Sequence, residues 1–322
     1  MGQFADVRSE VRVRPLELKN LGAADRIFRL AFGTFLGMPD PLQFGGDADF
    51  VRSRWRADPK SVLGAELNGD LVGSNFVTNW GSFGFFGPLT VRPDLWDKGI
   101  ARRLLESTVA MFETWGARHR GLYTFANSPK HVSLYQRFGF WPRNLNAAVQ
   151  KQVGPDARAA GWSKLSEAAT REQEGLIEAC REVTGEIFEG LNAEREIRAV
   201  IDQKLGEVVL LDQDTKLAGF GVCHCGAGSE AGSGKCYVKF GAIRPGPQAD
   251  RNFERLLDAC CALASERKLA TVTAGVHAGR IRAYRQCLNS GFHIQFLGLA
   301  METGTPGSGY NHADVFVLDD WR

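Results

Sequence analysis

The sequence predicts an α/β protein (α+β layered), with a mixed central sheet flanked by helices in each of two related halves. The chain has 322 residues, which is more than a single hydrophobic core usually serves. Short strand-like apolar runs alternate with amphipathic helical stretches. A strand followed by Arg-Pro and a long helix occurs twice, with Arg244 placed 152 residues after Arg92.

The first half begins with a predicted strand, VRVRPL, and a helix from about Asn20 to Phe35. A second helical stretch, ADFVRSRWRAD, ends before Pro59, because the residue before a proline disfavours helical geometry. The runs SVLGAEL and LVGSNFVTNW then form a hairpin around Asn68-Gly69-Asp70, and the strand GFFGPLTV follows.

After that strand, the sequence DKGIARRLL predicts a helix that begins near Gly99. The first N–H groups of a helix have no partners within it, so they attract anions. The small residues Gly99 and Ala101 allow a pyrophosphate to come close. Lys98, Arg102 and Arg103 add positive charge. This pattern indicates a phosphate-binding loop, although an ordinary glycine turn before an amphipathic helix has the same sequence features.

The residues after this helix give the loop a family context. A predicted strand, GLYTFA, is followed by Asn127 and by a helix that carries Tyr135 and ends in Gly139-Phe140. Together with Trp96-Asp97-Lys98-Gly99-Ile100-Ala101, this order resembles the GCN5-related N-acetyltransferase (GNAT) family. The loop of that family reads Gln/Arg-x-x-Gly-x-Gly/Ala, from which Trp96 departs. The resemblance covers roughly residues 10 to 153.

The resemblance implies an enzyme that transfers an acetyl group from acetyl-coenzyme A (acetyl-CoA) to a primary amine of a small molecule, without a metal. It implies that Tyr135 is catalytic and gives its phenolic proton to the departing thiolate. Backbone groups at the end of the fourth strand would bind pantetheine and the thioester, and the glycine loop would cradle the pyrophosphate. The cofactor-binding residues implied are Leu89, Thr90, Val91, Lys98, Gly99, Ile100, Ala101, Arg102 and Asn127.

Two of these roles have structural alternatives. Tyr135 also suits a core position beside Leu134 and Phe138, and Asn127 also suits a helix cap. The alternative function is a CoA-binding sensor or interaction module that has lost catalysis, which the departure at Trp96 favours.

The sequence does not identify a general base. Glu66, His119 and His131 are possible bases, and a water relay or an acceptor that arrives deprotonated are equally open. On the fourth strand, Phe83, Phe85 and Phe86 suggest an apolar wall for the acceptor. A peptide amine, a polyamine, an aminoglycoside and a xenobiotic amine remain possible acceptors, and the acyl-chain length is open.

The second half repeats the pattern without the chemistry. We expect a catalytic domain over residues 1–153, a linker over 154–164 and a degenerate GNAT-like domain over 165–322, although chance similarity of strand and helix patterns remains an alternative. Within the second half, GAGSEAGSGK is expected to be a flexible loop, and the terminal DVFVLDDWR a strand that either closes this half or serves across the boundary. At the shift of 152 residues, Arg251 replaces Gly99, Phe253 replaces Ala101, Gly279 replaces Asn127 and Cys287 replaces Tyr135.

Composition narrows the class of protein. The chain has 39 basic and 37 acidic residues, so its net charge is only +2, which favours neither nucleic-acid binding nor an electrostatic membrane anchor. The N-terminus has no apolar signal core. Seven cysteines after residue 179 indicate reduced thiols. In Cys223-His224-Cys225, strand alternation sends the sulfurs and the imidazole to opposite faces, which disfavours a metal site. We expect a cytoplasmic protein, monomer or homodimer.

Overall fold

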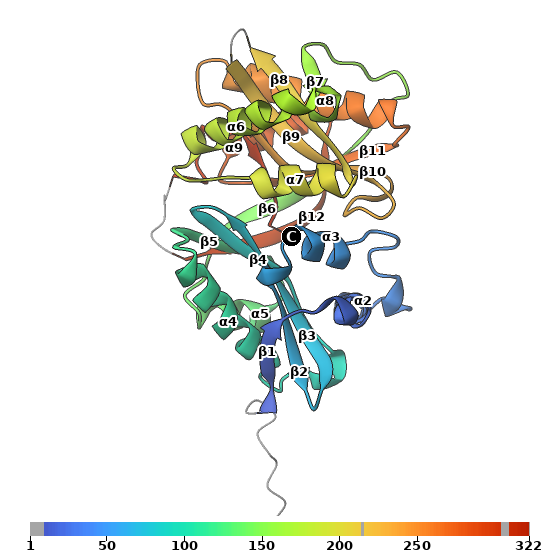
Figure 1. The fold of residues 1–322 in the computed structure, drawn as a ribbon, viewed down its shortest axis with the longest axis vertical. Helices are drawn as coiled ribbons and strands as arrows, with labels where there is room; N and C mark the ends of the chain where they lie inside the picture. Colours follow the sequence, from blue (N-terminus) through green and yellow to red (C-terminus); the bar gives the residue numbers. More distant parts are fainter. Residues whose placement is uncertain (1–9, 214–215, 304–308, 322) are drawn as a thin grey trace, which may run out of the picture.

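The computed structural model describes residues 10–213, 216–303 and 309–321. The extreme N-terminus, where we expect no signal segment, lies outside these ranges. The described strands form one sheet of 13 strands in the order β1-β2-β3-β4-β5-β12-β6-β11-β10-β9-β8-β7, with β13 paired to β10. Figure 1 shows the first half of the chain at one end of the molecule and the second half at the other. The predicted mixed sheet with flanking helices is confirmed.

The first half has the predicted order of elements. The two early helices end before Gly-rich or Pro-containing segments, and the turn between β2 and β3 places Asn68 and Gly69 at positive φ angles of 52° and 88°. The bounds are β1 Arg12–Pro15, α2 Leu21–Phe35, α3 Val51–Ala57, β2 Val62–Leu67, β3 Asp70–Trp80, β4 Phe83–Val91, α4 Ile100–Thr114, β5 His119–Thr124, α5 Pro129–Gln136 and β6 Trp141–Gln152.

The second half repeats this order at the predicted shift of 152 residues from its central strand onward. The strand after its meander, the long helix, the next strand, the short helix and the last long strand correspond to β4, α4, β5, α5 and β6. The bounds are β7 Trp162–Lys164, α6 Thr170–Ile187, α7 Glu194–Asp202, β8 Gly206–Gln213, β9 Lys216–Gly226, β10 Gly232–Ile243, α8 Ala249–Glu266, β11 Thr271–His277, α9 Ile281–Asn289, β12 His293–Glu302 and β13 Val317–Leu318.

The two halves exchange strands at the middle of the sheet. Strand β12 of the second half pairs with β5 of the first, where Leu299 lies opposite Thr124. On its other side β12 pairs with β6, and β6 continues into β11, where Val149 lies opposite Ala274. Each half therefore completes the sheet of the other, which the sequence alone does not reveal (Figure 1).

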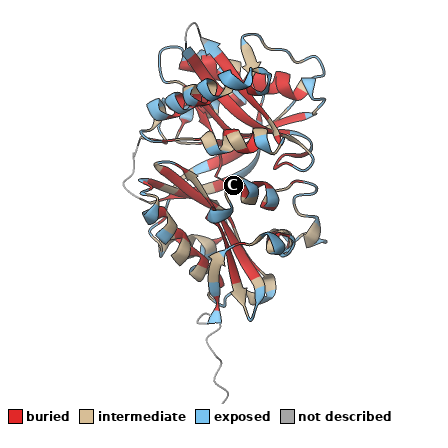
Figure 2. Ribbon diagram, in the orientation of Figure 1, coloured by how far each residue is buried: buried red, intermediate tan, exposed pale blue. Residues whose placement is uncertain are grey.

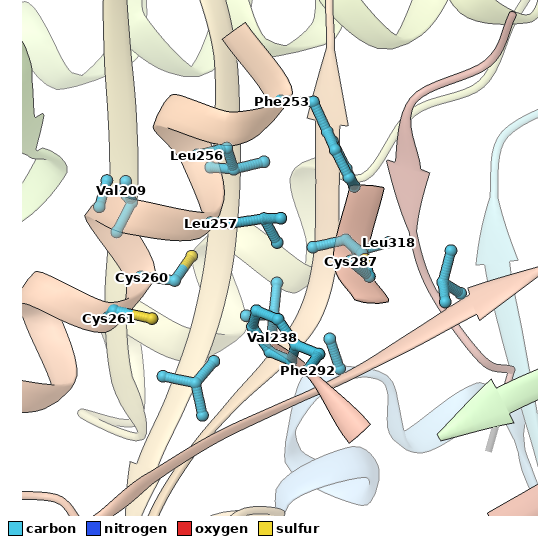
Figure 3. Close-up of a cluster of buried hydrophobic side chains, with 14 of the residues drawn as sticks. Val209, Val238, Phe253, Leu256, Leu257, Cys260, Cys261, Cys287, Phe292 and Leu318 are labelled. Atoms are coloured by element: carbon cyan, nitrogen blue, oxygen red, sulfur yellow. The ribbon is translucent and has the colours of Figure 1, made fainter. Parts of the chain in front are cut away.

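Helices cover both faces of the sheet (Figure 2), and one cluster of buried residues joins Trp80, Phe83 and Phe85 of the first half to residues of the second half. In the first half α4 packs against β2, β3 and β4, while α2 packs on β3 and β4. In the second half α8 forms the largest core. Figure 3 shows its Phe253, Leu256 and Cys260 grouped with Val238 of β10 and Leu318 of β13. All seven cysteines are free, and only Cys225 is not fully buried.

Two of the three aromatic residues that we expected at an acceptor wall belong to the core between the halves, and the third, Phe86, is buried in the core of the first half. Phe83 and Phe85 are 0% and 1% exposed and pack with Trp80 against residues of α6, α7 and β8 to β10. Alternation along β4 explains the error, because one face of this strand meets the second half rather than solvent. An acceptor cannot contact either ring in this arrangement.

The loop between β9 and β10, expected to be flexible, packs against the first half. Ser229 and Glu230 are buried, and the backbone N–H of Asp49 donates to the Ser229 carbonyl oxygen at 3.0 Å. Asp47 accepts a 2.8 Å hydrogen bond from the Ser233 N–H. The glycines here provide positive φ angles for tight turns rather than freedom of movement.

The terminal strand serves both places that the sequence left open. Strand β13 pairs with β10 of the second half, with Val317 opposite Ala242. The chain then continues to Trp321, which is 2% exposed and lies against Gly121 of β5 in the first half. No helix in the described part of the chain has both the length and the apolarity of a membrane span.

Candidate active site

Strands β4 and β5 form a fork in the sheet of the first half. They pair in parallel only from Phe83 to Phe86, opposite His119 to Leu122. Beyond this point β4 pairs only with β3, and the register shifts at the bulge that contains the cis peptide Gly87-Pro88. Since successive N–H groups of a strand point to opposite sides, alternate groups from residues 87 to 91 face the gap that β5 leaves. Strand β5 therefore does not pair with the backbone groups of β4 that face the gap, and a ligand can bind there.

Tyr135 lies at the apex of this fork. Its ring is 5.7 Å from that of Phe86, the last β4 residue paired with β5. Its hydroxyl hydrogen-bonds with the side chain of Thr124, the last residue of β5. Burial raises the pKa of Tyr135 to about 12, and this hydrogen bond opposes the rise. The phenol therefore keeps its proton at neutral pH and remains available as an acid.

The N-terminus of α4 lies beyond the end of β4. Gly99 is its N-cap with φ of 79°, a left-handed conformation that glycine adopts without strain. Lys98 and Arg102 are exposed beside it, and Glu106 pairs with both Arg102 and Arg103. The helix dipole and the excess of cations favour an anion at this end of the gap.

Trp96, the departure from the family loop, has a structural role. Its indole Nε1–H donates a 2.8 Å hydrogen bond to the Val91 carbonyl oxygen, and its ring packs in the core beneath α4. The Lys130 ammonium lies 5.9 Å from the centre of this ring and pairs with Asp97 at 2.6 Å. The side chain therefore fastens the loop to β4 and α5.

The other sequence-predicted residues surround the fork at different depths. Leu89, Thr90 and Val91 form the end of β4, and the Thr90 hydroxyl is buried 3.3 Å from that of Ser74. Asn127 is exposed in the turn after β5. It is not the helix cap: Ser128 holds that position, because Pro129 starts α5. Lys98, Gly99, Ile100, Ala101 and Arg102 form the loop and first turn of α4.

None of the three possible bases contacts the Tyr135 hydroxyl. Glu66 pairs with Arg14 at 2.6 Å on β2. His119 lies at the far end of β5, where burial lowers its pKa to about 4. His131 precedes Tyr135 by one turn of α5 and lies 5.2 Å from the ring of Phe35, and burial lowers its pKa as well. Among these, only His131 is on the same helix as Tyr135.

The equivalent fork of the second half is filled by the chain itself. Strands β10 and β11 pair from Lys235 to Val238 and then separate. Strand β13 occupies the separation, and Phe316 packs at 5.4 Å from Phe253, which stands where the first half has Ala101. This arrangement leaves no gap for a pantetheine chain in the second half.

The comparisons agree with this geometry. Residues 27–140 match the model of the Acetyltransferase (GNAT) family. This range begins within α2, ends just before β6, and includes the fork and Tyr135. This part of the chain is a GNAT-family domain. The family match supports an acyl-CoA-dependent N-acyltransferase activity for this domain. No curated protein matches the chain significantly by sequence.

Solved structures resemble the whole chain and show its fold. A candidate acetyltransferase from Pyrococcus horikoshii has a TM-score of 0.70 at 13% identity, covering 97% of this chain and 95% of its own. The N-myristoyltransferase of Saccharomyces cerevisiae, with bound myristoyl-CoA, has a TM-score of 0.62 at 10% identity and covers 95% and 83%. A tandem GNAT protein from the clavulanic acid biosynthesis pathway has 0.52 at 13% identity, covering 91% and 98%.

The sequence did not point to Phe86 or Thr124 as neighbours of Tyr135. Thr124 is the last residue of β5, and Phe86 is the last residue of β4 that pairs with β5. No group of three or more His, Cys, Asp and Glu side chains in the described ranges is arranged to hold a metal ion.

Proposed function

We propose that the GNAT domain transfers an acetyl group from acetyl-CoA to a primary amine of a small molecule. One observation carries this proposal: the first fork is open with Tyr135 at its apex and the α4 N-terminus at its mouth, whereas the second fork is filled by β13. An open gap lined by backbone donors fits a pantetheine chain, and a helix N-terminus flanked by cations fits a pyrophosphate.

In this proposal, residues at different positions along the gap bind different parts of acetyl-CoA. The backbone at Leu89 to Val91 binds the pantetheine and polarises the thioester carbonyl, while the loop from Lys98 to Arg102 holds the pyrophosphate. Acetyl-CoA supplies the activated acyl group when bound. Tyr135 donates its phenolic proton to the departing thiolate, which a pKa of about 12 permits at neutral pH. Asn127 contacts the cofactor from the turn after β5.

The two halves of the chain have different roles in this proposal. Residues 1–153 form the catalytic domain, 154–164 the connection and 165–322 the degenerate partner. The partner's strand β12 stabilises β5, and so supports one arm of the catalytic fork. A CoA-binding sensor remains the alternative function, because the structure places no carboxylate or imidazole in contact with the Tyr135 hydroxyl among the described residues.

The test is calorimetric titration of acetyl-CoA into the full chain and into Gly99→Glu. We expect micromolar binding that Gly99→Glu abolishes, since a carboxylate at the α4 N-terminus repels the pyrophosphate. The matched control is Gly246→Glu, which places the same side chain at a positive-φ glycine before α8.

The outcomes separate the two functions. Binding that only Gly99→Glu abolishes, together with acetyl transfer to amines, supports the enzyme. Binding without transfer to any amine supports the sensor. Absence of binding to the unaltered chain contradicts both.

A further inference from the structure

A narrow cavity lies between the two halves, beside the fork. Its volume is about 30 Å³, which is room for about two water molecules. One wall comes from α3 and from residues 76–79 of β3 in the first half, and the other from α7, β9, β10 and the loop before β10 in the second. The cavity therefore exists only because the halves are joined.

One side chain connects this cavity to the fork. The Arg54 guanidinium lines the cavity, and its Nη1 donates a 2.7 Å hydrogen bond to the Gly87 carbonyl oxygen. Gly87 begins the bulge at which β4 leaves β5. The cavity thus adjoins the backbone that, in the proposed function, binds the thioester.

The charged groups of the cavity already have partners. Glu230 accepts hydrogen bonds from Arg54 at 2.5 and 3.1 Å and from the Lys239 ammonium at 2.7 and 2.8 Å. Arg195 pairs with Asp58 at the cavity's outer part. A carboxylate on a ligand would find no uncommitted cation among these residues, and burying it unpaired is costly.

Among the described residues that line the cavity, His224 has a buried side-chain nitrogen without a hydrogen-bond partner. It is 2% exposed and lines the cavity from β9. Its Nδ1 accepts a 3.3 Å hydrogen bond from the Glu230 N–H, so the proton of the neutral ring is on Nε2. Burial lowers the pKa of His224 to about 4, which keeps the ring neutral at pH 7. Nε2 has no hydrogen-bond partner among the described residues.

We propose that this cavity is the specificity site for the acceptor, and that His224 Nε2–H binds an uncharged oxygen, a hydroxyl or carbonyl, on the acceptor amine. The inference rests on the proposed function. The cavity has room for such a group and not for a ring, and Arg54 joins it to Gly87 at the fork, so a short aliphatic amine is the acceptor we test. The degenerate half therefore selects the substrate of the catalytic half.

The experiment compares acetyl transfer to ethanolamine and to n-propylamine, which differ by one hydroxyl in place of a methyl group. His224→Asn keeps an acceptor near the Nδ1 position for the Glu230 N–H and removes the donor at Nε2. His224→Gln keeps a donor near the Nε2 position. The kcat/KM ratio of the two amines is compared between variants, so that the difference in amine pKa cancels.

We expect His224→Asn to lower the ratio of ethanolamine to n-propylamine roughly tenfold through KM, the size of one buried hydrogen bond. His224→Gln retains most of the preference, and His293→Asn on exposed β12 leaves the ratio unchanged. Equal ratios in the Asn and Gln variants overturn the inference. A chain that binds acetyl-CoA and acetylates neither amine also overturns it, whereas a chain that binds no acetyl-CoA contradicts the proposed function itself.

Discussion

The indole Nε1–H of Trp96 donates a 2.8 Å hydrogen bond to the carbonyl oxygen of Val91. This contact joins the loop before α4 to the last residue of β4. It therefore fixes the position of the proposed pyrophosphate-binding loop relative to the strand that binds the pantetheine in our proposal. A glutamine or arginine at this position, as the family pattern has, would be free to contact a ligand. In this chain the position instead determines the shape of the loop.

We predict that Trp96→Phe raises the dissociation constant for acetyl-CoA about three- to tenfold, because it removes one partly buried hydrogen bond and keeps most of the ring packing. Calorimetry measures the effect. Trp115→Phe, at the far end of α4, is the control and leaves affinity unchanged. An unchanged affinity in Trp96→Phe would show that the loop holds its shape without this bond.

Tyr135→Phe removes the proposed acid and keeps the ring against Phe86. We expect kcat to fall roughly 10²-fold, while acetyl-CoA affinity changes less than twofold, because the phenol acts on the leaving group. A coupled thiol-release assay measures this. Tyr284→Phe on α9, the helix that corresponds to α5, is the control. Full activity in Tyr135→Phe would show that Tyr135 packs in the core and is not the catalytic acid.

Glu230 holds two buried cations across the boundary between the halves. Glu230→Gln leaves Arg54 and Lys239 without a counterion, and we expect it to lower the free energy of unfolding by about 3–5 kcal/mol. Urea denaturation measures the loss. Glu189→Gln removes an exposed partner of Arg118 and serves as the control, with little change expected. Equal stabilities of the two variants would refute a stabilising role for the buried cluster.

The free energy of unfolding should fall as pH drops from 6.5 to 5. Burial lowers the pKa of His119 and His224 to about 4, so the unfolded chain takes up these protons first. Each histidine then costs roughly 2 kcal/mol over this range. Burial raises the pKa of Glu302 to about 6, which works in the opposite sense below pH 6 and offsets part of the loss.

Urea denaturation at pH 7 and pH 5 checks this prediction. His224→Gln, which cannot titrate, should reduce the difference between the two pH values. A free energy of unfolding that is the same at both pH values would mean that these histidines are solvated in solution.

A chain that ends at residue 153 should not fold into a stable monomer. Strand β12 separates β5 from β6, so its loss exposes an edge on each of them in the middle of the sheet. We expect an aggregated product by size-exclusion chromatography, and recovery of soluble material on co-expression with residues 154–322. A soluble 1–153 fragment with the acetyl-CoA affinity of the full chain would contradict this expectation.

Local patterns in the sequence predicted most elements of the fold and the residues of the fork. The Asn68-Gly69 turn, Gly99 before α4, and Tyr135 on α5 depend on neighbours within a few positions, where spacing and propensity are informative. The repeat at 152 residues aligned the later elements of both halves. These features follow from short-range physical chemistry.

The contacts between the two halves could not be predicted from local sequence patterns. Arg54 and Glu230 are 176 residues apart, and nothing near either one reveals the other. His224 was interpreted correctly as pointing away from its flanking cysteines, yet what it faces depends on how the halves meet. The expected flexibility of the loop at Glu230 failed for the same reason, because its glycine content does not show that it packs against Asp47.

The exchange of β6 and β12 also limits how this architecture changes by recombination. Joining the first half of one such protein to the second half of another would require matching strand edges on both sides of each exchanged strand, not one compatible linker. A crossover between genes at the connection would usually yield halves that fit neither each other nor themselves. The two halves can therefore diverge in chemistry but have to be inherited as a single unit.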